Sequence, residues 1–202
     1  MAALPRVTFF HAPNSRSGGT RALLEELGVP YDMKILDFEK REHKSPEYLK
    51  INPMGKVPAI VHRGTVVTEA AAICVYLADA YPKAGLAPAL DDPQRATYLR
   101  WLFFGAGCVE PAIVDKMLHR PTVERKSALG YGSYEDAVNA LEGALWPGPW
   151  ILGQRFSAAD IYVGALVQWG SQVKALEPRP KFVQYMERIA ARPALQKTLK
   201  GA

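Results

Sequence analysis

One stretch, residues 52–81, constrains the fold of this chain more than any other part of the sequence. Its turn at residues 54–56 leads into Val57 and Pro58. Because proline has no N–H and forces the preceding residue into an extended conformation, Pro58 cannot lie inside a sheet ladder. We therefore expect Val57 to present unpaired backbone N–H and C=O groups, an edge on which an extended peptide can bind. We also predict a cis Val57–Pro58 bond, with an ordinary trans turn as the alternative.

A hairpin and a helix complete this stretch. Residues 59–67 predict two short strands, followed by Thr68 as the N-cap of a helix that Pro82 ends. Glu69 then places a carboxylate in the first helical turn. Free N–H groups at a helix start can hold a carboxylate and Glu69 can hold an ammonium, so together they suit an α-amino acid. In the alternative interpretation, Glu69 only satisfies the helix dipole.

The first part of the chain has a regular alternation of elements. Residues 7–10 predict a strand, residues 20–27 a helix and residues 31–36 a second strand. This order is a βαβ unit, whose two strands should be parallel. With the hairpin, it predicts a small α/β domain over residues 1–82 that resembles the thioredoxin fold.

Strand patterns end at that boundary. Residues 83–91 are typical of a linker, and residues 92–202 predict an all-helical second domain. Within it, Ser157 and Asp160 are spaced as a capping box. We interpret this as a structural device, worth about 1–2 kcal/mol, and assign it no chemistry.

Charge and cysteine content exclude several classes of function. The net charge is +5, but the basic residues are scattered among apolar positions, which indicates a solvated helical face and no nucleic-acid partner. Cys74 and Cys108 have no C-x-x-C partner and suit a reducing compartment. Residues 1–6 lack a signal-peptide core and no apolar run reaches about 18 residues, so we expect a soluble, cytoplasmic protein away from membranes. Without a P-loop, a G-x-S-x-G elbow or metal-ligand spacing of histidines, we also expect no metal.

The order of these features resembles the glutathione-binding half of the glutathione S-transferases. Residues 52–58 (N-P-M-G-K-V-P) and 69–73 (E-A-A-A-I) carry the resemblance, and an S-x-A-D element at 157–160 extends it over the chain. The similarity is to bacterial members of theta- or beta-like type. It implies a thioredoxin-like domain and a helical domain that forms the electrophile site, with glutathione as co-substrate. It also implies a homodimer and a role in detoxification.

The resemblance assigns the thiolate-stabilising serine to the loop before the first helix. Ser17, four residues ahead of Arg21, matches that serine of the theta- and delta-type transferases. A free thiol has a pKa of about 8.5, and a hydroxyl donor at a helix start stabilises the thiolate. Ser15 and Asn14 are close enough to take this role instead, and Ser17 could simply cap the helix.

The other glutathione contacts follow from the resemblance one residue at a time. His43 matches a theta-type histidine near the glycine carboxylate, with an exposed loop histidine as the alternative. Lys56 pairs with the same carboxylate, and Val57 pairs its backbone with the cysteinyl residue. Glu69 holds the γ-glutamyl ammonium. Ala70 replaces the family's common serine, so its N–H remains but a hydroxyl contact is lost, which weakens binding by about 0.5–1.5 kcal/mol.

A second substrate is expected between the two domains. Trp101, Phe104 and Cys108 follow helical spacing and could line a pocket for a hydrophobic electrophile, or simply pack in the core. The expected reaction is conjugation of the glutathione thiolate to that electrophile. Glutathione-dependent isomerisation, peroxide reduction or disulfide reduction, and a non-catalytic binding protein, are the alternatives. Because residues 14–17 contain no cysteine, a mechanism that uses a protein thiol is disfavoured.

Overall fold

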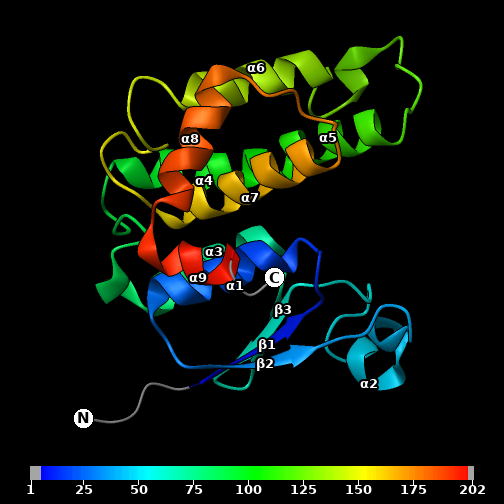
Figure 1. Cartoon of the computed structure of the whole chain (residues 1–202), viewed down its shortest axis with the longest axis vertical. Coiled ribbons are helices and arrows are strands. Elements are labelled where there is room, and N and C mark those ends of the chain that lie inside the picture. Colours follow the sequence, from blue (N-terminus) through cyan, green and yellow to red (C-terminus); the bar gives the residue numbers. More distant parts are fainter. Residues whose placement is uncertain (1–5, 200–202) are drawn as a thin grey trace. The chain divides into compact units, whose positions relative to one another are not determined.

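The computed structural model describes residues 6–199, which divide into two compact units (Figure 1). The first unit runs to Ala84 and also contains the last helix, α9 (Pro193–Leu199). The second unit is Gly85–Arg192. Because α9 packs against α1 (Ser17–Leu27), it belongs with the first unit, although the sequence pattern groups it with the helical domain.

A four-stranded sheet forms the centre of the first unit. Its strands are β1 (Val7–His11), β2 (Tyr31–Ile35), β3 (Ala59–His62) and β4 (Thr65–Thr68). They lie in the order β2-β1-β3-β4. β1 and β2 are parallel with α1 between them in sequence, which confirms the predicted βαβ unit. β3 is antiparallel to both β1 and β4, and the β3–β4 pair is the predicted hairpin.

Helices cover one face of this sheet. Figure 1 shows α1, α3 (Ala70–Ala80) and α9 together on that face, with α2 (Pro46–Leu49) away from them. The fully buried side chains of this unit include Phe9, Leu23, Leu24, Ile60, Ile73 and Leu77. Burial of each such side chain contributes about 1.5–3 kcal/mol. Two short 3-10 turns, η1 (Glu42–Lys44) and η2 (Pro82–Ala84), complete the unit.

The second unit is helical, as the absence of strand patterns predicted. Its helices are α4 (Gln94–Phe104), α5 (Glu110–Met117), α6 (Tyr134–Ala144), α7 (Ala158–Gln172) and α8 (Pro180–Ala190). A π-helical turn, η3 (Gly105–Val109), joins α4 to α5 just before Pro111, the second residue of α5. Between α5 and α6 the chain forms the short turn η4 (Lys126–Ala128), and Gly132 has a φ of +70°, which interrupts a regular helix there. No helix among the described residues is both long and apolar enough to cross a membrane.

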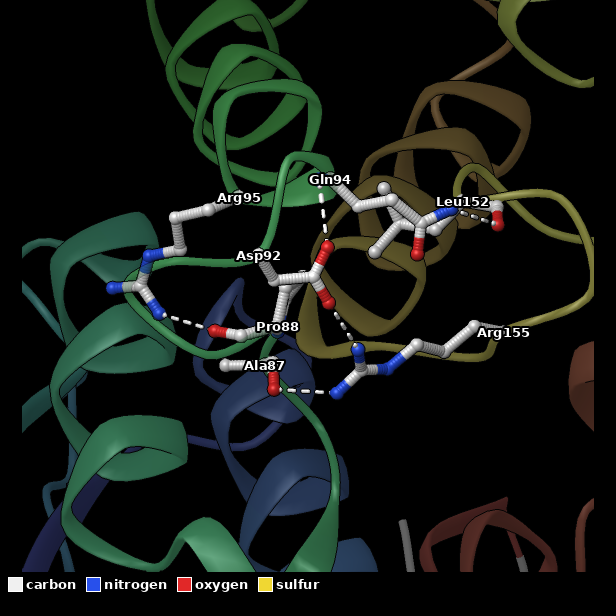
Figure 2. Close-up of polar contacts among 7 residues, drawn as sticks. All are labelled: Ala87, Pro88, Asp92, Gln94, Arg95, Leu152 and Arg155. Atoms are coloured by element: carbon white, nitrogen blue, oxygen red, sulfur yellow. Dashed lines mark hydrogen bonds and ion pairs between the residues drawn. The ribbon is translucent and has the colours of Figure 1, made fainter.

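The segment that follows the first unit is tied to the second, as Figure 2 shows. Arg155 donates from Nη2 to the carbonyl oxygen of Ala87 at 2.7 Å and pairs with Asp92 at 3.1 Å. Arg95 donates from Nη1 to the carbonyl oxygen of Pro88 at 3.0 Å. These contacts fix a stretch that the sequence pattern indicated only as a linker.

The predicted capping box at the start of α7 is present. The Ser157 N–H donates to Asp160 Oδ2 at 2.9 Å. The Ile151 N–H and the Tyr185 hydroxyl donate to Asp160 Oδ1, at 2.8 Å and 3.0 Å. Burial raises the pKa of the Asp160 carboxyl and outweighs the hydrogen bonds, which lower it. A buried carboxyl with this many donors links α7, α8 and the preceding loop, so its role is structural.

Candidate functional site

The register of the sheet gathers the sequence-predicted site segments at one end. Ala59 pairs with both Phe10 and Thr68, so the C-terminal ends of β1 and β4 lie beside the N-terminal end of β3. The loop after β1, the pair Val57–Pro58 before β3, and Glu69 after β4 therefore meet there. Because β2 is parallel to β1, the loop after β2 also begins at this end.

Val57 is an open backbone position in this group. The Val57–Pro58 bond is cis, as predicted, and Pro58 is buried while Val57 is half-buried. Neither the N–H nor the C=O of Val57 forms a hydrogen bond with any residue that the structure describes. The carbonyl oxygen just before it, on Lys56, accepts from the Tyr48 hydroxyl at 2.5 Å and from Asn52 Nδ2 at 2.8 Å. The hydrogen bonds to Lys56 therefore hold this stretch of backbone in place, while the N–H and C=O of Val57 stay open to a ligand.

A glycine turn brings η1 to this edge. Gly55 has a φ of +59°, and its N–H donates to the carbonyl oxygen of Asn52 at 2.8 Å. A Cβ atom at Gly55 would lie 2.6 Å from the carbonyl oxygen of His43, so the turn packs directly against η1. Only glycine permits both this φ and this approach. The Lys44 ammonium adds a second link by donating to the carbonyl oxygen of Met54 at 2.9 Å.

The two side chains assigned to the glycine carboxylate differ in exposure. The His43 ring packs on Phe38, with 4.3 Å between ring centroids. Its Nδ1 atom is buried and has no hydrogen-bond partner within the described part of the chain. Lys56 is exposed, and its ammonium forms no ion pair with the residues described. Both positions thus keep polar groups that a ligand could use.

Glu69 has strained backbone geometry. Its φ of 65° and ψ of 116° are rare for a residue with a side chain and cost on the order of 1–3 kcal/mol. The prediction of Thr68 as the N-cap is wrong, because β4 extends through Thr68 and Glu69 takes the cap position without a side-chain capping bond. Glu69 is exposed. Ala70 begins α3 with an N–H that has no acceptor within the helix.

The three candidate thiol contacts differ in burial. Ser17 is the first residue of α1 and is fully buried, whereas Ser15 is half-buried and Asn14 is exposed. Ser17 Oγ lies 2.6 Å from Ser15 Oγ, so these two hydroxyls belong to one hydrogen-bonded group. The structure therefore brings two of the three candidates together and leaves Asn14 at the surface.

His11, at the end of β1, is a site residue that the sequence analysis missed. It is buried, and its Nδ1 atom lies 2.7 Å from Ser17 Oγ. Burial lowers the pKa of the imidazole, and the Arg21 guanidinium lowers it further, so the neutral ring is favoured. No spacing in the sequence distinguishes this histidine, because its partner is recognisable only once the loop folds back on β1.

The residues predicted to meet the electrophile lie on one helical stretch of the second unit. Trp101 is buried, and its ring meets that of Phe104 in a T-shaped contact with 5.2 Å between centroids. Cys108 is half-buried in η3, with Sγ 3.6 Å from the carbonyl oxygen of Gly130, and burial raises the pKa of its thiol. The pocket itself stays a prediction. In residues 6–199, no group of three or more His, Cys, Asp or Glu side chains could hold a metal ion.

Comparison with known proteins identifies the family. Profiles described as "Glutathione S-transferase, N-terminal domain" and "Glutathione S-transferase, C-terminal domain" match residues 5–79 and 121–188. Glutathione S-transferase GstA of Escherichia coli O157:H7 is 31% identical over 95% of this chain and 96% of its own. The chain belongs to the glutathione S-transferase family.

Two further proteins are similar to this chain over nearly its whole length. The disulfide-bond oxidoreductase YfcG of Escherichia coli (strain K12) is 28% identical over 97% of this chain and 95% of its own. The crystal structure of a glutathione transferase homolog from Sulfitobacter, with bound glutathione, has a TM-score of 0.79 at 27% identity. That match covers 97% of this chain and 98% of the other. The thioredoxin-like N-terminal domain and helical C-terminal domain of the glutathione S-transferase fold are therefore confirmed.

Proposed function

We propose that this chain is a glutathione transferase that joins the thiolate of reduced glutathione to a hydrophobic electrophile. The observation that carries the proposal is the free backbone pair of Val57, at the sheet end where Glu69 also lies. An extended tripeptide can add to such an edge through main-chain hydrogen bonds. The glutathione bound to the Sulfitobacter homolog supports this choice of ligand.

Charged and polar groups near Val57 match the two ends of the tripeptide. Glu69 pairs with the γ-glutamyl ammonium, and the Ala70 N–H at the start of α3 binds the neighbouring carboxylate. At the other end, Lys56 and His43 attract the glycine carboxylate. Because Ala70 offers no hydroxyl, we expect binding to be weaker than with serine by about 0.5–1.5 kcal/mol.

The reaction requires the thiol as its anion. The thiol proton leaves to water, and a hydroxyl of the loop at residues 14–17 donates a hydrogen bond to the thiolate. The sulfur then forms a bond to the electrophilic carbon, and the leaving group departs with its electron pair. Trp101, Phe104 and Cys108 supply apolar surface for the electrophile.

Two measurements test this function. Calorimetry with millimolar reduced glutathione should give binding heat, and an aryl halide should be consumed with release of halide. Glu69→Gln removes the partner of the ammonium and should weaken glutathione binding about tenfold. Glu187→Gln, a matched change at an exposed residue of α8, should leave binding unchanged. A wild-type protein that shows neither binding heat nor thermal protection with glutathione would contradict the proposal.

Disulfide reduction by glutathione is a second candidate, because the similar protein YfcG is described as a disulfide-bond oxidoreductase. Residues 12–17 contain no cysteine, so the sulfur of glutathione would itself attack the disulfide and release a thiolate. A second glutathione would then resolve the mixed disulfide. Turnover of a small dialkyl disulfide without conjugation of the aryl halide would favour this reaction. Glutathione binding without either reaction would favour a non-catalytic binding protein.

We also propose a homodimer, a cytoplasmic location and a role in detoxification, on the strength of the family alone. Light scattering coupled to gel filtration should give the mass of two chains. A mass of one chain at micromolar concentration would contradict the dimer.

A further inference from the structure

Three side chains form a continuous hydrogen-bonded series from the end of β1 to the loop that follows it. His11 Nδ1 lies 2.7 Å from Ser17 Oγ, which lies 2.6 Å from Ser15 Oγ. Ser15 Oγ in turn lies 2.7 Å from the carbonyl oxygen of Ala12. Because His11 and Ser17 are buried and Ser15 is half-buried, the series leads outward.

The direction of each hydrogen bond follows from the carbonyl group at the end of the series. A carbonyl oxygen can only accept, so Ser15 donates its single hydroxyl proton to Ala12. The contact between Ser17 and Ser15 must then be donated by Ser17. With that proton used, the contact between His11 and Ser17 must be donated by the imidazole, which places the ring proton on Nδ1.

The remaining contacts agree with this direction. Ser17 Oγ also accepts from the Ala12 N–H at 3.2 Å, which fills its second lone pair, and Ser15 Oγ accepts from the Ser17 N–H at 3.2 Å. The competing contact of Ser17 Oγ with the Ala12 carbonyl is the longest of the group, at 3.3 Å. In the reverse direction Ser15 would donate its only proton to Ser17. The oxygen of Ser15 would then lie 2.7 Å from the Ala12 carbonyl oxygen with no proton between them, which is unfavourable.

We propose that Ser15 is the hydroxyl that touches the glutathione sulfur, and that His11 and Ser17 are positioning residues that aim it. This rests on the proposed function, since glutathione is the ligand. When the thiol proton has left to water, the Ser15 proton turns from the Ala12 carbonyl to the thiolate. Ser17 cannot take that role, because it is fully buried with its proton and both lone pairs engaged. Donors that point in one direction strengthen one another, so the inner two polarise the last.

His11 supplies its hydrogen bond as a neutral ring. Burial lowers the pKa of the imidazole, and Arg21 on α1 is the charged group that lowers it further. The ring also lies against Phe9, which carries no charge, with 5.5 Å between ring centroids. Because the His11 ring stays neutral around pH 7, the direction of the hydrogen bonds from His11 to Ser15 does not change there. The pH dependence of the reaction should therefore follow the thiol of glutathione and not His11.

Nitrogen NMR of the free protein tests the direction without glutathione. The two ring nitrogens of a neutral imidazole have well-separated chemical shifts, so the protonated nitrogen is identified directly. We expect the proton of His11 on Nδ1. A proton on Nε2 would reverse the series and overturn the proposal, whether or not the protein binds glutathione.

The role of Ser15 is tested on the complex with glutathione, where the ultraviolet absorbance of the thiolate gives the pKa of the bound thiol. Ser15→Ala should raise that pKa by about one unit and lower kcat/KM at neutral pH about tenfold, with little change in glutathione affinity. Ser171→Ala, at an exposed position of α7, should change neither value. If the bound thiol titrates alike in Ser15→Ala and the wild type, Ser15 does not touch the sulfur.

Two replacements of His11 separate positioning from packing. His11→Asn keeps an N–H donor near the place of Nδ1, whereas His11→Leu removes it. We expect the leucine variant to raise the pKa of the bound thiol and the asparagine variant to restore most of the wild-type value. Equal thiol pKa values in the two variants would refute the positioning role. A wild-type protein that binds no glutathione would refute the proposed function instead, and the NMR result would still decide the direction of the series.

Discussion

The Tyr81 hydroxyl lies 2.9 Å from Nε2 of His62, inside the first unit. The other ring nitrogen of His62, Nδ1, lies 3.1 Å from the Tyr76 hydroxyl, so both nitrogens of this fully buried ring have partners. Burial lowers the pKa of His62, and Arg63 lowers it further. His62 is therefore kept neutral in the folded protein, where it links β3 to the end of α3.

We expect the stability of the protein to decrease as pH falls below about 6.5. In the unfolded chain His62 binds a proton near that pH, whereas its pKa in the folded protein is lower. The unfolded state therefore binds more protons in this range, and acid shifts the equilibrium toward it. The stability that the neutral ring contributes is complete above about pH 6.5 and is lost below it. Melting temperatures measured from neutral to mildly acidic pH test this loss of stability.

Replacing His62 shows how much of the pH dependence of the melting temperature comes from this residue. His62→Gln should flatten the decrease in melting temperature, although His11, whose pKa is also lowered, keeps part of it. His119→Gln, at an exposed position, is the control and should leave the decrease unchanged. A wild-type melting temperature that stays constant from neutral to mildly acidic pH would show that neither buried histidine acts in this way.

Arg155 should stabilise the second unit through the segment that it holds. Arg155→Ala removes the hydrogen bond to the Ala87 carbonyl and the ion pair with Asp92. The side chain of Arg155 is 36% exposed and that of Asp92 is 28% exposed. Because solvent screens such a pair, we expect a loss of only about 1 kcal/mol in the free energy of unfolding, measured in urea. Arg155→Lys should recover little, since one ammonium cannot reach both acceptors in the guanidinium geometry.

The exposed Arg125 provides the comparison for this measurement. Arg125→Ala should change the unfolding free energy by less than about 0.5 kcal/mol, the usual range for surface substitutions. Equal losses for the two alanine variants would mean that the contacts of Arg155 in Figure 2 contribute nothing beyond an ordinary surface arginine.

Gly55 should be needed both for stability and for the glutathione site. Gly55→Ala places a Cβ atom 2.6 Å from the carbonyl oxygen of His43, at a φ of +59°. Gly64→Ala has a comparable φ of +77°, but its Cβ atom would meet no atom of residues 6–199 within 4 Å, so it isolates the backbone cost. We expect the melting temperature and the glutathione affinity to fall clearly more for Gly55→Ala than for Gly64→Ala. Matching losses would indicate that η1 moves away from the turn without consequence.

Local rules of chain chemistry predicted the parts of the site that depend on neighbours in sequence. Pro58 predicts the unpaired backbone found at Val57, and the spacing of Ser157 and Asp160 predicts the capping box that is found. Rules of this kind failed where pairing between strands decides the outcome. Thr68 is a good N-cap residue, but the hairpin register holds it in β4 opposite Ala59.

Other features could not be predicted because they depend on contacts distant in sequence. His11 becomes part of the site only through the loop that carries Ser17, and no spacing rule connects a strand end to that hydroxyl. The start of α9 at Pro193 could not be predicted for a related reason. Pro193 is compatible with the end of one helix and equally with the first turn of the next, and packing on α1 selects the second.

Ala70→Ser, which restores the family's common serine next to Glu69, should increase the affinity for glutathione. Ala70 is the first residue of α3, where a hydroxyl would lie beside the N–H groups that we propose bind the γ-glutamyl carboxylate. One added hydrogen bond of about 0.5–1.5 kcal/mol lowers the dissociation constant by roughly threefold to tenfold, which calorimetry resolves. Ala72→Ser is the control. It makes the same replacement at an exposed position of the same helix, where the hydroxyl should not contact glutathione. If both serine variants bind glutathione as the wild type does, the start of α3 does not hold that carboxylate, and the placement of the tripeptide along Val57 would have to be revised.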